Sequence, residues 1–150
     1  MSNMNFYPSW WNTTVTIFNK HKDSNDLITW YKHVVHGCFW KYIGNKVTVG
    51  NTELESNDII CRIRKDSAFL ENYQWVELPS EEKPEYFTLT KGDIIVKGEV
   101  DDVINEYQSG SRSSDIIQKY KALQGCMIMS EYTVNTDGGR CNEHYLVKGE

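Results

Sequence analysis

Residues 87–104, FTLTKGDIIVKGEVDDVI, combine two glycines, Gly92 and Gly98, with a cluster of carboxylates. Such a mixture could bind phosphate or support acid–base catalysis. A phosphate loop needs its glycines between a strand and a helix, followed by a Lys–Ser/Thr pair, and this stretch contains no such pair. The adjacent Asp101 and Asp102 would point to opposite faces of a strand and could not flank one bond. We therefore interpret the stretch as a compact β-meander whose glycines allow turns with positive φ.

A second group of chemically capable residues is HVVHGC, which contains His33, His36 and Cys38. In a regular strand, His36 and Cys38 would share one face and His33 would lie on the other. Two ligands on one face do not make a metal site, so we expect these side chains to be structural. The four cysteines form no CxxC pair, and we expect them to be reduced and mostly buried. They are Cys38, Cys61, Cys126 and Cys141.

Candidates for nucleophilic catalysis are equally weak. The serines of residues 108–114 lie in a polar linker without a GxSxG motif. Glu81 and Glu82 lie in a proline-bounded loop, where solvation is the simplest interpretation. We expect no catalytic residues, no metal and no cofactor, and therefore a protein that is not an enzyme.

Aromatic residues are the most unusual feature, with five Trp, nine Tyr and five Phe. An aromatic segment before the first strand either packs on its own domain or docks on a partner, because Trp and Tyr are frequent interface anchors. Both alternatives remain open, and stacking on a sugar is a third. The candidate partner-interface residues are Phe6, Tyr7, Trp10, Trp11, Tyr73 and Trp75.

A short basic stripe lies in CRIRK, residues 61–65. In a strand, Arg62 and Arg64 would share the face opposite Cys61 and Ile63. A solvated outer face is the simpler interpretation, and contact with DNA is the alternative if this strand lines a DNA passage. The net charge of −5 argues against a surface that coats nucleic acid generally.

Apolar and polar residues alternate through most of the chain. This pattern predicts a mainly β fold, an antiparallel barrel or sandwich of about eight short strands, with one short helix near 115–124. Gly37 is expected to mark a bulge or bend in the long run 27–42. The predicted strands are 14–19, 27–42, 45–50, 58–65, 87–90, 94–96, 99–107, 126–134 and 140–148.

The 150 residues are expected to form one domain, 1–150, with an aromatic N-terminal segment at 1–12 and a long loop at 66–84. A chain of this length needs no disulfide or metal to stabilise its core. No apolar run reaches the roughly 20 residues that span a bilayer, so no membrane partner is expected. The first residues have no pattern of a signal peptide, and we expect synthesis in the cytoplasm.

Several of these segments together resemble small head–tail connector proteins of long-tailed bacteriophages, most closely the head-closure type, also called stopper or neck-valve proteins. The resemblance runs from about Thr13 to Lys148. It rests on TVTIFNKHKDSNDLITWYKHVVHGCFW, VTVGNTELESNDIICRIRKD, EEKPEYFTLTKGDIIVKGEVDDV and LQGCMIMSEY.

The resemblance implies a structural protein of the virion neck. Such proteins form a ring homo-oligomer between the portal and adaptor proteins above and the tail terminator or tail tube proteins below. The ring closes the DNA-filled head, contacts the DNA in passing and offers the surface to which the tail attaches. The protein would be made in the cytoplasm of the host bacterium and would end in the virion.

Two alternatives remain. The first is a tail-terminator or tail-completion protein, which also forms a ring at this junction. The second belongs to another class, an aromatic-rich carbohydrate-binding β-module, whose sugar binding would depend on Trp75 or Trp11.

Overall fold

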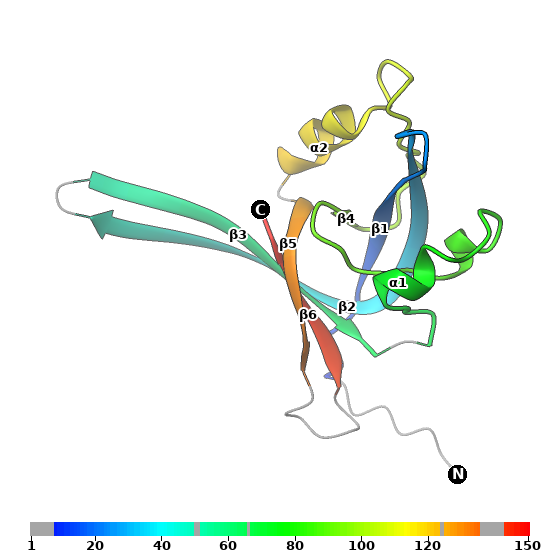
Figure 1. The fold of residues 1–150 in the computed structure, drawn as a ribbon. Helices are drawn as coiled ribbons and strands as arrows, with labels where there is room; N and C mark the ends of the chain where they lie inside the picture. The colour runs from blue at the N-terminus through cyan, green and yellow to red at the C-terminus, as the bar shows by residue number, and fades with distance from the viewer. Residues whose placement is uncertain (1–7, 50–51, 66, 124, 136–142) are drawn as a thin grey trace, which may run out of the picture.

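The computed structural model describes residues 8–49, 52–65, 67–123, 125–135 and 143–150, with the side chains of 44–49, 52–57 and 135 left out. Six strands close into an antiparallel barrel in the order β1-β2-β3-β6-β5-β4 (Figure 1). The strands are β1 (Thr13–Lys22), β2 (Ile28–Val49), β3 (Thr52–Arg64), β4 (Ile94–Lys97), β5 (Cys126–Asn135) and β6 (His144–Gly149). The helices are α1 (Asn72–Trp75), the 3₁₀ helix η1 (Lys83–Glu85) and α2 (Ser113–Lys121).

The barrel is therefore confirmed, and the prediction of about eight strands is slightly wrong. The predicted strands 27–42 and 45–50 form one continuous strand, β2. Residues 87–90 form only an isolated bridge, between Phe69 and Phe87, and residues 99–107 form no strand. In these two segments side chains bind the backbone in place of a strand partner. The N–H of Thr88 donates to Asn19 Oδ1, and the N–H of Val100 donates to Thr16 Oγ1.

The core has two parts, and both use β1 and β4. Inside the barrel, Val15 and Ile17 of β1 pack with Ile95 of β4 and with residues of the other strands. Phe18 of β1 and Ile94 of β4 belong to a second cluster, which also contains Ile116 of α2. Because both faces of β1 and β4 are covered, their apolar runs are continuous instead of alternating.

Gly37 lies at a bulge, as its position predicted. Its φ is +74°, and the register between β1 and β2 shifts between Thr13 and Val15. Val35 and Cys38 are consequently both in the core, although they are three residues apart, and His36 is exposed. The expectation that His36 and Cys38 share a face is wrong, because the extra residue reverses the alternation of faces.

The helix predicted near 115–124 is α2, which begins two residues earlier and ends three residues earlier than predicted. Asp115 Oδ2 accepts a hydrogen bond from the N–H of Arg112 at the start of the helix (3.1 Å). Ile116 is buried, whereas Leu123 lies beyond the helix and is 78% exposed. The helix covers the second core cluster and leaves Leu123 on the surface.

The tetrapeptide VKGE occurs twice, at 96–99 and 147–150, and its glycines have different roles. Gly98 follows β4 with φ +99°, which confirms the predicted tight turn. Gly149 lies in β6, where an added Cβ would be 2.3 Å from the carbonyl oxygen of Ile128. One glycine is needed for its conformation and the other for close packing.

Candidate functional site

A buried polar network joins β1 to the chain segment before β4. The carboxylate of Asp93 accepts hydrogen bonds from Asn19 Nδ2 (2.8 Å) and from the backbone N–H groups of Lys20 and Thr90 (3.0 Å each). Asn19 also donates to the carbonyl oxygen of Thr88 (2.7 Å). All of these donors belong to the fold itself, so the network fastens the segment before β4 to the barrel.

Asp93 is a buried acid whose pKa differs clearly from its ordinary value. Burial raises its pKa to about 6, although the hydrogen bonds from Lys20, Asn19 and Thr90 act in the opposite direction. A carboxyl group that titrates near neutral pH is a candidate general acid when it faces a cleft. Asp93 is instead 1% exposed, so we assign it to stability.

The other carboxylates of the stretch 87–104 connect loops. Asp102 accepts hydrogen bonds from the hydroxyl of Tyr120 and from Lys119 Nζ (2.9 Å), and both interactions lower its pKa. It thereby ties the loop after β4 to α2. Asp101 is exposed. The two adjacent carboxylates therefore have different surroundings, one bound to α2 and the other exposed.

The histidines of HVVHGC bind separate parts of the fold. His33 Nδ1 lies 2.8 Å from the carbonyl oxygen of Pro84, and His36 Nδ1 lies 3.0 Å from Thr14 Oγ1. Cys38 is buried in the core. Among the residues that the structure describes, no group of three or more His, Cys, Asp or Glu is arranged to hold a metal ion.

The two candidate DNA-facing arginines bind neighbouring parts of their own chain. Arg62 Nη1 donates to Nε2 of the buried His144 (2.7 Å), so Nε2 is the acceptor nitrogen. Arg64 donates from Nε to the carbonyl oxygen of Gly37 (2.8 Å) and from Nη2 to that of Trp11 (3.0 Å). Both side chains are half-buried. Arg64 thus fixes the bulge and the N-terminal segment on the barrel.

The aromatic N-terminal residues divide between core and surface. Trp11 is buried, and its ring is 5.1 Å from the ring of His144 and 6.4 Å from that of Phe39. Trp10 is 60% exposed and packs edge-to-face on Phe39 at 5.4 Å. Phe6 and Tyr7 lie outside the described residues. Of the two described tryptophans, Trp10 is the one that remains available to a partner.

The loop aromatics divide in the same way. Tyr73 is 70% exposed, whereas Trp75 is fully buried. The ammonium group of the buried Lys83 lies 5.4 Å from the centre of the Trp75 ring and 5.9 Å from that of Tyr31. Lys83 also donates to the carbonyl oxygens of Val76 and Leu78. Trp75 is therefore part of the packing that holds α1 on the barrel.

A two-stranded arm, residues 43–49 and 52–58, is the main feature that the sequence analysis missed. Here β2 and β3 pair only with each other, from Ile43–Asp58 to Val49–Thr52. The pairing of β1 with β2 ends at Cys38, and that of β6 with β3 ends at Ile59. Figure 1 shows the arm extending away from the barrel. At about 3.3 Å per residue, its seven residue pairs span roughly 20 Å.

The sequence did contain a signal for the arm. Gly50-Asn51 is a two-residue combination typical of a hairpin turn. The first half of the second strand was not predicted, because residues 52–57, TELESN, have a polar composition that is typical of a loop. The register places Lys46 opposite Glu55 and Val47 opposite Leu54.

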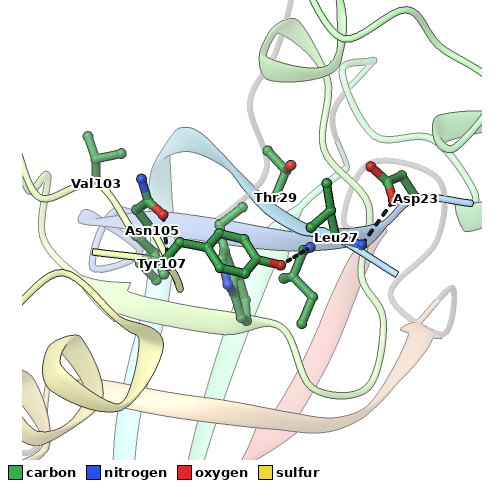
Figure 2. Close-up of a pocket in the computed structure, with 9 residues that line it drawn as sticks. Asp23, Leu27, Thr29, Val103, Asn105 and Tyr107 are labelled. Atoms are coloured by element: carbon green, nitrogen blue, oxygen red, sulfur yellow. Dashed lines mark hydrogen bonds between the residues drawn. The ribbon is translucent and has the colours of Figure 1, made fainter. Parts of the chain in front are cut away.

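An open pocket of about 410 Å³ lies between the β1–β2 turn and the loop after β4 (Figure 2). Leu27, Val103 and Tyr107 line it, and each side chain is at least half exposed. The hydroxyl oxygen of Tyr107 accepts a hydrogen bond from the N–H of Ile28 (2.9 Å), which fixes the ring beside the turn. Asp23 is also part of the lining. The pocket combines segments about 80 residues apart in the chain, so no local sequence pattern could reveal it.

None of the helices in the described residues is long and apolar enough to cross a membrane.

Comparisons with known proteins identify a family and no individual relative. A family model described as "Family of unknown function (DUF6751)" matches residues 10–150. No curated protein matches the chain. No solved structure matches it. The family match covers every strand of the barrel and the arm.

Proposed function

The chain belongs to the family of unknown function DUF6751, and we propose that it is a structural protein of a bacteriophage neck. In this proposal, several copies form a ring between the portal and adaptor proteins and the tail. The ring closes the DNA-filled head and provides the surface to which the tail attaches. The observation that supports this role best is the arm, residues 43–49 and 52–58.

The arm has the properties of an assembly element. A two-stranded ribbon is marginally stable alone in water, and the outer edges of this ribbon have no strand partner among the described residues. Strand edges with free N–H and C=O groups pair readily with another chain. An arm of roughly 20 Å on a rigid barrel reaches well into a neighbouring subunit. A second protein chain therefore completes the arm in the proposed ring.

The interior of the molecule supports a structural role in preference to catalysis. Asp93, Asp102 and the histidines of HVVHGC each bind another part of the same chain. Burial also raises the pKa of Cys126 to about 11, which keeps this thiol protonated and a poor nucleophile. These groups act as fasteners between strands, loops and α2.

The net charge of the chain suits a conduit through which DNA passes. The chain carries a net charge of −5, and a strongly basic channel would hold DNA in place. Arg62 and Arg64 are engaged by His144, Gly37 and Trp11. We propose that they stabilise the barrel and that contact with DNA is only transient.

The carbohydrate-binding alternative has lost its main support. It depended on exposed indole rings at Trp11 or Trp75, and both rings are buried. A tail-terminator or tail-completion ring would use the same arm and barrel, so it remains the alternative within the proposal.

Immunogold electron microscopy tests the proposed position. A chain with an epitope tag in the exposed segment near Ser109 would be produced in place of the native chain. Purified particles are expected to carry gold only at the head–tail junction. A matched tag on a major tail-tube protein controls for access of the antibody. Label along the tail, over the head shell, or absent from particles would contradict the neck assignment.

A further inference from the structure

The arm, residues 43–49 and 52–58, has two outer edges that differ in strand direction. β2 runs outward from the barrel and β3 runs back toward it, because the two strands are antiparallel. Neither outer edge has a strand partner among the described residues. In an antiparallel ladder, alternate residues of a strand turn their N–H and C=O groups toward the partner strand, and the others turn theirs away. About half of the backbone groups of each arm strand therefore point outward and can accept a further strand.

Rotational symmetry determines which of these edges can meet in the proposed ring. When neighbouring arms lie edge to edge and project to the same side of a ring, the outer edge of β3 in one copy faces the outer edge of β2 in the next copy. These two strands run in opposite directions, so they can form the same antiparallel ladder that joins β2 to β3 within the arm. The contact joins different surfaces of the two copies, which is the type of contact that closes after a full turn. A two-fold contact would instead place β2 beside β2, or β3 beside β3.

The formal charges of the two arm strands favour the first of these arrangements. The segment 43–49, IGNKVTV, carries one positive charge, from Lys46. The segment 52–58, TELESND, carries three negative charges, from Glu53, Glu55 and Asp58. A contact between β3 of one copy and β2 of the next joins segments of opposite charge, whereas a two-fold contact joins segments of like charge. Opposite charges on adjacent strands stabilise a sheet, and like charges destabilise it.

We propose that β3 in the arm of one copy pairs edge to edge with β2 in the arm of the next copy, so that the arms together form one continuous antiparallel sheet around the ring. A sheet that closes in this way leaves no arm edge unpaired, which protects the assembled ring from further edge-to-edge association. This inference rests on the proposed ring, and it identifies the partner of each arm as a second copy of the same chain.

Exchanging the charges of the two arm strands tests this pairing on the full chain. The variant Lys46→Glu, Glu53→Lys, Glu55→Lys retains Asp58, so it gives segment 43–49 a charge of −1 and segment 52–58 a charge of +1. Opposite charges are kept within each arm, and the variant is expected to form rings with itself. Beside a wild-type copy, each contact would join two segments of like charge. Mixed rings are therefore expected to be about tenfold rarer than random mixing gives.

Native mass spectrometry at low ionic strength measures the composition of the rings. ¹⁵N-labelled wild-type chain and unlabelled variant would be combined in equal amounts before assembly, and the mass of each ring gives its number of labelled copies. Rings of random composition, a preference for mixed assemblies as a two-fold contact predicts, or no wild-type rings up to millimolar concentration would overturn the proposal. Glu131→Lys with Lys148→Glu is the matched control, because these register partners are exposed and lie on the barrel. This control variant should mix with wild-type chain at random.

Hydrogen exchange of the arm amides separates this pairing from other ways of forming a ring. In the ring, the outward N–H groups of both arm strands are expected to exchange about tenfold more slowly than in the unassembled chain. Slower exchange in only one of the two strands, or in neither, would refute the pairing of arm with arm. The neck assignment would remain intact in that case, because particles made after deletion of the gene test it independently.

Discussion

At the scale of single residues, several buried or half-buried polar side chains form hydrogen bonds that connect different segments of the chain. Asp93 and Arg64 each bind groups from two separate segments of the chain, and Lys83 donates to two carbonyl oxygens just after α1. Hydrogen bonds to charged groups are roughly twice as strong as neutral ones, which suits this use. These hydrogen bonds stabilise loops that have little regular secondary structure of their own.

Asp93 gives the fold a specific dependence on pH. Its folded-state pKa of about 6 lies above the ordinary value for Asp, so the folded state binds this proton more tightly than the unfolded chain does. The stabilisation of the folded state by this tighter proton binding is therefore fully present below about pH 4, and it is lost as pH rises through 6. We expect the free energy of unfolding to fall by up to about 3 kcal/mol across that window.

Urea unfolding of wild type and Asp93→Asn between pH 4 and pH 7 measures this contribution. The variant cannot titrate at residue 93, so the difference between the two pH profiles isolates Asp93 from His21, whose pKa is lowered mainly by burial. The variant is also expected to be less stable overall, because an amide nitrogen would face a backbone N–H donor. Parallel pH profiles would show that Asp93 does not titrate in this range.

Gly37 is expected to be the least replaceable residue of the β1–β2 bulge. An alanine there would have an unfavourable positive φ, and its Cβ would lie 2.9 Å from Arg64 Nε. We expect Gly37→Ala to lower the free energy of unfolding by about 2–3 kcal/mol. Gly98→Ala is the matched control, because Gly98 also has positive φ but has no atom within 4 Å of the added Cβ. Equal losses in denaturant titrations would show that the Arg64 contact is unimportant.

At the scale of elements, the sequence predicted those strands and turns that depend on neighbouring residues alone. The barrel strands 14–19, 58–65 and 126–134, the bulge at Gly37 and the turn at Gly98 all follow from alternation and from glycine conformation. Strands were wrongly predicted at 87–90 and 99–107 because their hydrogen bonds go to Asn19 and Thr16, side chains about 70 to 85 residues away. Hydrogen bonds between residues so far apart in the chain cannot be predicted from a local sequence pattern.

The candidate sites were less predictable than the strands. Trp10 and Trp11 are neighbours of the same type, yet one is exposed and the other is buried. Trp75 lies in a segment that the sequence predicts to be a loop, yet Tyr31 and Lys83 pack against its ring. Composition identifies aromatic anchors, whereas the tertiary fold decides which of them remain on the surface.

The arm should be separable from the barrel. Ile43 and Asp58 are register partners, so an Asn-Gly turn in place of residues 44–57 would close the shortened hairpin. We expect the shortened chain to fold with a thermal midpoint within a few degrees of wild type. Its incorporation into particles should be lost, because the arm contacts another chain in the proposed ring.

Circular dichroism and quantitative mass spectrometry of purified particles measure these two properties. Replacing 44–57 with an unrelated hairpin of equal length controls for the simple loss of chain. Normal incorporation of the shortened chain would contradict the assembly role of the arm, and an unfolded shortened chain would show that the arm belongs to the folding unit.

At the scale of the whole molecule, six strands close into a barrel, and the arm extends from it as a two-stranded ribbon. A closed barrel is a rigid unit that can repeat around an axis, and the outer edges of the arm have no strand partner among the described residues. In the proposed ring, a net charge of −5 would disfavour retention of DNA. These properties are compatible with the proposed role in a bacteriophage neck.

Electron microscopy of particles made after deletion of this gene tests the neck assignment most directly. The account predicts tailless heads that are empty or leaking, next to finished free tails, with normal particles restored by the wild-type chain supplied from a plasmid. Full heads that retain their DNA, combined with tails of abnormal length, would favour the tail-terminator alternative. Intact normal particles would contradict the account.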